Sequence, residues 1–140
     1  MDEGAVGWLA DRAAIEDLGA RYNRSFDDLD VEAWCSTFTN DGMMSLDGRQ
    51  WRGRAELAHL IDRIGFGMVH VTANAVIAID GDTATQECSL LLLERSRDRT
   101  PVRLLTTGRY RDALVRTDQG WRFERREAVT DSDLARRPMP

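Results

Sequence analysis

The sequence predicts an α+β fold, in which N-terminal helices pack against the concave face of a curved antiparallel sheet. Apolar residues recur at helical spacing in the first 65 residues, and from residue 67 onward apolar and polar residues alternate as in long strands. Turn signals such as "DGD" at 80–82 and "DQG" at 118–120 separate the strand-like stretches. Helices followed by an antiparallel meander are typical of this fold class. A sheet that curves over helices leaves a pocket at its open end, a common place for a small ligand.

Three helices are expected in the first half of the chain. The first covers residues 6–28, where apolar residues line one face of the helix. A short second helix over residues 30–38 has Asp30 as its N-cap. The third covers residues 53–65 and is closed by Gly65, because glycine readily adopts the backbone conformation that ends a helix.

Four long strands are expected after the helices, over residues 67–79, 83–95, 101–117 and 121–131. Shorter strand-like pieces lie in "TNDGMMSLDGRQWRG", where glycines mark two turns. In the first long strand the alternation predicts two faces. One face carries Val69, Val71, Ala73, Ala75, Ile77 and Ile79, and the opposite face carries Met68, His70, Thr72, Asn74, Val76 and Ala78. The last residues, "LARRPMP", are expected to form a loose tail.

Composition excludes several classes of protein. The 140 residues suffice for one domain, with its core over about residues 8–130. No apolar run approaches the ~18 residues of a membrane span, and the acidic N-terminus is unlike a signal peptide. The formal net charge of −5 argues against a general nucleic-acid binder. Cys35 and Cys88 lack disulfide or metal spacing, so buried free thiols in a reducing cytoplasm are expected.

His70 is the first candidate for chemistry, because a neutral imidazole is the usual general base near neutral pH. Such a base needs an orienting carboxylate on its other ring nitrogen, and Asp27, Asp28 and Asp30 lie where the first helix ends. Asp28 and Asp30 are expected to act at helix ends only, whereas the residues alone leave Asp27 undecided. The alternative for His70 is a hydrogen-bonded core histidine without chemistry. His59, in the third helix, is expected to be a surface or packing residue.

Several large side chains are candidates to line an apolar pocket. On composition, the aromatic residues are mostly expected in the core or at a subunit interface. If some of them line a pocket, the ligand is bulky, apolar and ring-containing. The candidate substrate-binding residues are Trp34, Phe38, Met44, Trp51, Phe66 and Met68. The sequence has no dinucleotide or phosphate-binding glycine loop, nucleophile elbow or metal-ligand spacing, so chemistry without cofactor or metal is expected.

The order and spacing of several short motifs resemble those of the SnoaL-like group within the nuclear-transport-factor-2-like superfamily. The motifs are "DRAAIEDLGARY", "FDDLDVEAW", "FTNDG", "WRGRAEL", "HVTANAVIAIDGDTAT", "GRYRDALVRTDQGWRF" and "ERREAV". The resemblance is strongest to small cofactor-free lyases of the dehydrochlorinase, bile-acid 7α-dehydratase and scytalone dehydratase type. It implies a cone-shaped α+β barrel with a deep apolar pocket, and a homodimer or homotrimer.

The resemblance also implies roles for individual residues. It places a catalytic His–Asp pair at His70 and Asp27, a functional tyrosine at Tyr22 and a pocket arginine at Arg126. Arg126 has the alternative of a structural ion pair with Glu94 or Glu124. The expected function is a cofactor-free lyase or isomerase acting on a hydrophobic, polyketide- or steroid-like molecule. The alternatives are a polyketide (aldol) cyclase, and a non-catalytic binding or assembly module of the same fold.

Overall fold

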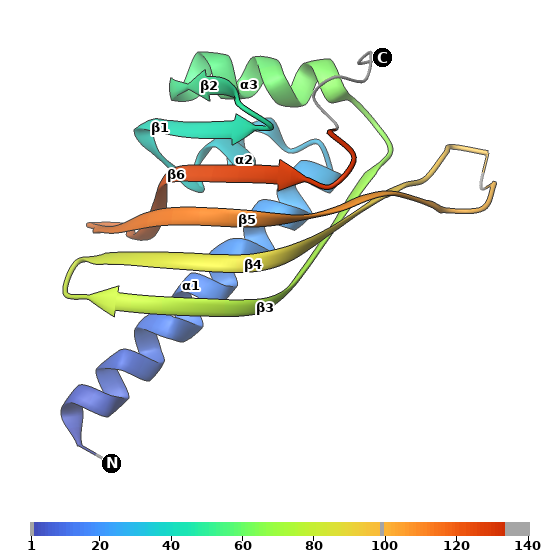
Figure 1. Cartoon of the computed structure of the whole chain (residues 1–140). Coiled ribbons are helices and arrows are strands. Elements are labelled where there is room, and N and C mark those ends of the chain that lie inside the picture. Colours follow the sequence, from blue (N-terminus) through green and yellow to red (C-terminus); the bar gives the residue numbers. More distant parts are fainter. Residues whose placement is uncertain (1, 99, 134–140) are drawn as a thin grey trace.

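Helices and sheet form two layers, with the helices against the concave side of the sheet (Figure 1). The computed structural model describes residues 2–98 and 100–133. The loose tail expected at residues 134–140 therefore lies outside the described residues. The fold is the predicted α+β class, with an open, curved sheet of six strands.

The three expected helices are present. They are α1 (Glu3–Asp27), α2 (Val31–Cys35) and α3 (Gly53–Ile64). Asp30 caps α2, since its carboxylate accepts a hydrogen bond from the backbone amide of Ala33 at 3.1 Å. Gly65 ends α3 with a φ of 68°, a backbone conformation that glycine adopts without steric cost. In the described part of the chain, no helix is both long and apolar enough to cross a membrane.

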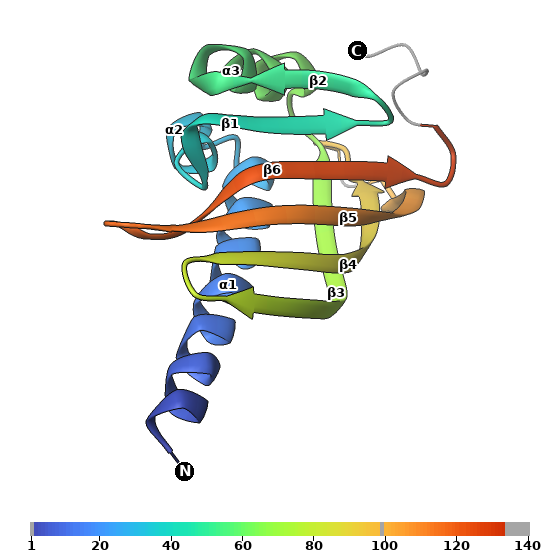
Figure 2. The ribbon, with the colours of Figure 1, turned by 60° about the vertical axis from the view of Figure 1, so that its left-hand side comes forward.

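The six strands are β1 (Phe38–Leu46), β2 (Arg49–Arg52), β3 (Met68–Asp80), β4 (Thr83–Glu94), β5 (Arg103–Thr117) and β6 (Gly120–Thr130). Their order in the sheet is β2-β1-β6-β5-β4-β3. The four long strands form the predicted antiparallel meander. The sheet is nevertheless mixed rather than wholly antiparallel, because β1 lies parallel to β6 (Figure 2). A parallel neighbour is possible here because the long chain between β1 and β6 includes α3 and the whole meander.

Strand β3 departs from the predicted alternation at a bulge. Its pairing with β4 shifts register between Ala73 and Val76, and Asn74 has a φ of 58°. The extra residue moves later side chains to the other face of the sheet. Ile77 is therefore buried on the side that carries His70, whereas Val71 is 45% exposed. The prediction that Val71 and Ile77 share a face is wrong for this reason.

The core fills the space between the helices and the concave face of the sheet. Large side chains from α1, α2 and α3 meet those of the strands there, among them Ile15, Tyr22, Trp34, Leu60 and Phe123, each at most 2% exposed. Cys35 and Cys88 are free and buried, as predicted. Burial of apolar surface on this scale is the main stabilising contribution to such a fold.

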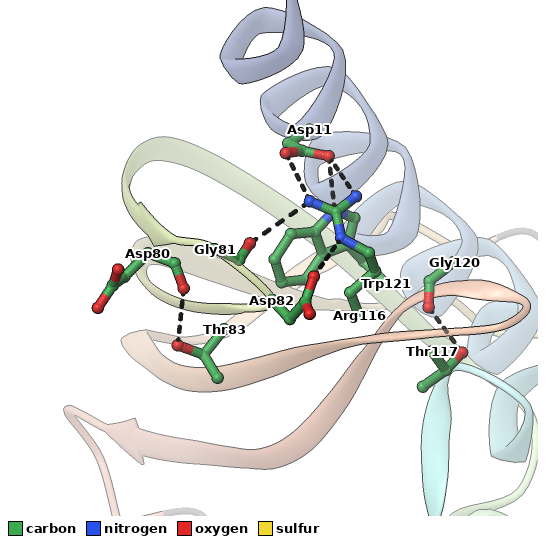
Figure 3. Close-up of polar contacts among 9 residues, drawn as sticks. All are labelled: Asp11, Asp80, Gly81, Asp82, Thr83, Arg116, Thr117, Gly120 and Trp121. Carbon is green, nitrogen blue, oxygen red and sulfur yellow. Dashed lines mark hydrogen bonds and ion pairs between the residues drawn. The ribbon is translucent and has the colours of Figure 1, made fainter. Parts of the chain in front are cut away.

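A polar cluster fastens the N-terminal half of α1 to the far end of the sheet (Figure 3). Arg116 of β5 forms a bidentate pair with Asp11 of α1, at 2.7 and 2.8 Å. The same guanidinium contacts Asp82 at 3.0 Å, and the Trp121 indole also donates to Asp11. Beyond this cluster the first turns of α1 extend past the β3 edge of the sheet (Figures 1 and 2).

Candidate functional site

Asp27 and His70 meet where the end of α1 approaches the start of β3. The His70 Nδ1 atom lies 2.7 Å from Asp27 Oδ1, within hydrogen-bonding distance. The Asp27 carboxylate also accepts the backbone amide of His70, at 3.0 and 3.1 Å. Asp27 is the last residue of α1, so its side chain can reach the sheet while Asp28 remains exposed as the C-cap.

The carboxylate holds one ring nitrogen of His70 and leaves the other available. Because the Asp27 carboxylate accepts a hydrogen bond from Nδ1–H, the neutral ring carries its lone pair on Nε2. No described residue forms a hydrogen bond with Nε2. The ring itself is enclosed, with a side chain only 6% exposed, and it packs edge-on against Phe26 at 4.7 Å and Tyr22 at 6.1 Å between ring centroids.

His70 borders a small, almost wholly apolar cavity. Its lining comes from two helices and five strands and consists of Tyr22, Phe26, Met44, Leu46, Leu60, Ile64, Met68, His70, Leu90, Leu92, Tyr110 and Ala128. The cavity volume is about 30 Å³, which is room for about one water molecule. The arrangement therefore presents a potential base to an apolar space that is closed to a ring-sized molecule in this conformation.

The six candidate substrate-binding residues are divided by the structure. Met44 and Met68 line the cavity beside His70. The other four lie outside its lining: Trp34 and Phe38 are buried in the aromatic core around Tyr22, Trp51 lies partly buried on β2, and Phe66 is 42% exposed just before β3. The residue types alone cannot separate these two groups, because both are large and apolar.

Tyr22 is a buried wall of the cavity. Its hydroxyl lies 3.6 Å from the Met44 sulfur, a weak acceptor. Burial raises the pKa of Tyr22, while the nearby charge of Arg126 opposes that change. The hydroxyl is therefore protonated at neutral pH and can donate a hydrogen bond to a molecule in the cavity.

Arg126 lies behind Tyr22 and outside the lining of this cavity. Its Nε atom is 3.0 Å from Asp112 Oδ1 and its Nη2 atom 3.3 Å from Oδ2, and both side chains are almost fully buried. Arg126 thus forms an ion pair, as the alternative prediction expected, but its partner is Asp112 rather than Glu94 or Glu124. Glu94 instead pairs with Arg103 at the surface.

Aromatic rings surround the Arg126 guanidinium. Its central carbon lies 3.6 Å from the ring centroid of Tyr110, 4.3 Å from that of Tyr22 and 4.4 Å from that of Phe123. Nη1 is buried and has no hydrogen-bond partner. The attraction between the guanidinium charge and the π faces of these rings offsets the cost of that missing hydrogen bond. Arg126 also borders a separate cavity of about 260 Å³, which is lined mainly by residues of α1 and β3.

Sequence reasoning missed the residues that support Arg126. Burial raises the pKa of Asp112, and the opposing effects come from Arg126 and from Gln86, whose amide donates to the carboxylate at 2.8 Å. Asp112 lies directly opposite Arg126 in the β5–β6 pairing. Alternation could have placed both on the inner face, but only the register of the two strands identifies them as partners. Across residues 2–98 and 100–133, no cluster of three or more histidine, cysteine or acidic side chains could hold a metal ion.

The chain is similar to several known proteins. Residues 8–127 match the SnoaL-like domain. A protein of unknown function from Mycobacterium tuberculosis is 30% identical, with a TM-score of 0.83 over 94% of this chain and 77% of its own. An NTF2-like protein with a cystatin-like fold from Novosphingobium aromaticivorans is also 30% identical, with a TM-score of 0.82 over 94% and 90%.

A third solved structure is that of a scytalone dehydratase-like protein, also from Novosphingobium aromaticivorans. It is 25% identical, with a TM-score of 0.76 over 87% of this chain and 85% of its own. No curated protein matches the sequence. These similarities confirm the resemblance and the fold expected from the motifs.

Proposed function

The chain belongs to the SnoaL-like domain family, and from that premise we propose that it is a cofactor-independent lyase or isomerase. Its substrate would be a hydrophobic, ring-containing small molecule, and His70 would act as the general base. The observation that carries this proposal is the 2.7 Å contact between His70 Nδ1 and Asp27 at the edge of an apolar cavity. A binding module has no need of a carboxylate on that nitrogen, whereas a base does.

The proposed reaction begins at the Nε2 lone pair of His70. This nitrogen removes a proton from a carbon next to an activating carbonyl, and the C–H electrons form a new double bond as a group leaves the neighbouring carbon. Asp27 stabilises the imidazolium that results. Tyr22 donates a hydrogen bond to the carbonyl or to a departing hydroxyl, and water is released when the leaving group takes up the proton. If no group leaves, the His70 imidazolium returns the proton to another carbon of the conjugated system, and the double bond shifts.

We assign Arg126 a positioning role in this reaction. It borders no part of the His70 cavity, so its contact with a substrate there is blocked by Tyr22 and Tyr110. Its guanidinium supports the ring of Tyr22 from behind, and Asp112 fixes the guanidinium in turn. Arg126 would therefore act through the orientation of Tyr22, while Met44 and Met68 would contact the substrate.

The small cavity is the one observation that favours the alternative, a non-catalytic module of the same fold. A volume of about 30 Å³ admits no ring system without side-chain movement. The polyketide (aldol) cyclase alternative starts with the same proton transfer and uses the same pair. The lining nevertheless supports a hydrophobic ligand in each case, because His70 and the two tyrosine hydroxyls are its main polar groups.

The test is turnover of cyclic ketones that carry a hydroxyl or halide β to the carbonyl, followed by the absorbance of the conjugated product. His70→Gln and Asp27→Asn are expected to lower turnover by about 10²–10⁴-fold, the usual contribution of a general base. His59→Gln and Asp28→Asn are matched controls, because both residues are exposed. Turnover that survives His70→Gln or Asp27→Asn would end the proposal.

A further inference from the structure

The lining of the His70 cavity reaches the surface at only a few residues. Nearly all of its lining residues are buried, and the partly exposed ones are Ile64, Met68 and His70. The His70 side chain is itself only 6% exposed. Ile64 and Met68 are therefore the side chains that separate the cavity from solvent, and they stand at the two ends of a five-residue segment, 64–68.

The residues between them give this segment unusual backbone freedom. Gly65 has a φ of 68° and Gly67 a φ of 119°, both in the region that favours glycine. They flank Phe66, whose side chain is 42% exposed. The segment joins the end of α3 to the start of β3 and runs beside the base of the projecting β4–β5 hairpin (Figure 1). Rotation at the two glycines, with fraying of the last residue of α3 and the first residue of β3, would move Ile64 and Met68.

Contacts with the hairpin hold the segment closed. The Arg97 guanidinium lies 4.4 Å from the centroid of the Phe66 ring, and that of Arg95 lies 5.5 Å away. The Arg95 backbone amide donates to the Gly67 carbonyl at 2.9 Å. A Cβ atom at Gly67 would come within 2.8 Å of the Arg95 carbonyl oxygen, so this close approach requires glycine. The contacts at the ring are exposed and individually weak, which suits a closure that opens often.

We propose that residues 64–68 form the entrance to the His70 cavity and that the Phe66–Arg97 contact is its latch. The entrance rests on the proposed function in one respect, that the molecule admitted is the apolar ring compound on which His70 acts. Release of Phe66 from Arg97 lets Ile64 and Met68 swing outward. The space that they vacate extends the cavity of about 30 Å³ toward solvent.

The test uses NMR of the full chain labelled with ¹³C-methyl methionine, without turnover. Met44 and Met68 line the cavity, whereas Met43 is buried on β1 outside its lining and serves as the internal control. In the free protein, the Met68 methyl is expected to show microsecond-to-millisecond exchange that Met43 lacks. With 1-tetralone, a bicyclic ketone without a leaving group, the signals of Met44 and Met68 should shift while that of Met43 stays.

The variant Arg97→Gln tests the latch. It is expected to raise the rate of 1-tetralone association by about two- to fivefold, the loss of one exposed cation–π contact. Arg103→Gln is the matched control, because Arg103 is an exposed arginine of the same hairpin that pairs with Glu94 instead. Equal association rates in Arg97→Gln and the unaltered protein would overturn the latch.

Two further outcomes concern the entrance itself. A Met68 methyl without exchange, or a 1-tetralone response at Met43 alone, would overturn the assignment of residues 64–68. If Met68 exchanges and Arg97→Gln enhances that exchange, but 1-tetralone shifts no methyl signal, the entrance stands and the choice of a ring ligand is overturned. The His70→Gln variant should still admit 1-tetralone. Entry without turnover of any compound would therefore reject the catalytic proposal and leave the entrance intact.

Discussion

Two acid–base pairs face the concave side of the sheet, and they differ in how many of their polar atoms have a hydrogen-bond partner. In the Arg126–Asp112 pair both side chains are at most 1% exposed, and the carboxylate is held by two guanidinium nitrogens and the Gln86 amide. In the His70–Asp27 pair the carboxylate contacts only Nδ1 of the ring, and His70 borders a cavity. A buried pair whose polar atoms are nearly all engaged stabilises one structure. A pair that leaves one ring nitrogen without a partner, beside a cavity, can interact with a bound small molecule.

The largest expected effect comes from breaking the buried pair. Arg126→Met removes the cation that pairs with the buried Asp112, so the free energy of unfolding should fall by about 3–5 kcal/mol. Urea unfolding of the variant measures this loss, and Arg125→Gln, an exposed neighbour, is the control. Adding Asp112→Leu to Arg126→Met should restore most of the loss, because no buried charge then remains. A loss below about 1 kcal/mol would contradict the assignment of this pair to the scaffold.

A smaller effect is expected at the other pair. Asp27→Asn keeps one acceptor oxygen for the His70 backbone amide, so the free energy of unfolding should fall by only about 1–2 kcal/mol. The ring should lose its preference for a proton on Nδ1, which ¹⁵N NMR of histidine detects directly. His59, which is exposed, provides the reference signal. If the ring keeps the same tautomer without the carboxylate, Asp27 does not orient it.

The smallest effect on the free energy of unfolding is expected at the Asp11–Arg116 pair. This pair lies at the surface and serves as a reference for the two pairs on the concave side of the sheet. The hydrogen bond from Arg116 lowers the pKa of Asp11. The contribution of Asp11 to stability is therefore complete above its unfolded pKa of about 3.9, and it is lost as pH falls through the lower folded pKa.

Thermal unfolding between pH 2 and 7 measures this contribution. Asp11→Asn should lower stability at pH 7 by less than about 1 kcal/mol and should flatten the decline below pH 4. Added salt should shrink the difference from the unaltered protein, since the pair is exposed to solvent. An Asp11→Asn variant that declines with acid as steeply as the unaltered protein would show that other carboxylates control this range.

Local signals in the sequence predicted the elements well. The caps at Asp30 and Gly65 and the turns after β3 and β5 depend on a few neighbouring residues, so they could be identified without the fold. The bulge at Asn74 could not, because residues 75–79 are all apolar and so fit either face of the sheet. Asparagine tolerates a positive φ, but nothing nearby indicates that this one adopts it.

Distant pairings were harder to predict than elements. Asp27 and His70 are 43 positions apart, and their pairing was expected from the family resemblance rather than from the residues themselves. The Arg126–Asp112 pair depends on the register of β5 against β6, which hydrophobic patterning restricts to a face but not to a partner. The volume of the cavity depends on how side chains from two helices and five strands fill one space, a property of packing that no single segment encodes.

The arrangement around Arg126 also has a spectroscopic consequence. The chain has only two tyrosines, and both stack on this one guanidinium. Burial raises the pKa of each, that of Tyr110 most strongly. The two tyrosines should therefore not ionise at alkaline pH while the protein is folded. The near-ultraviolet absorbance of ionised phenol should then rise in one step when the protein unfolds. A simple alkaline titration of this protein thus reports on cooperative unfolding around a single buried cation, without any introduced label.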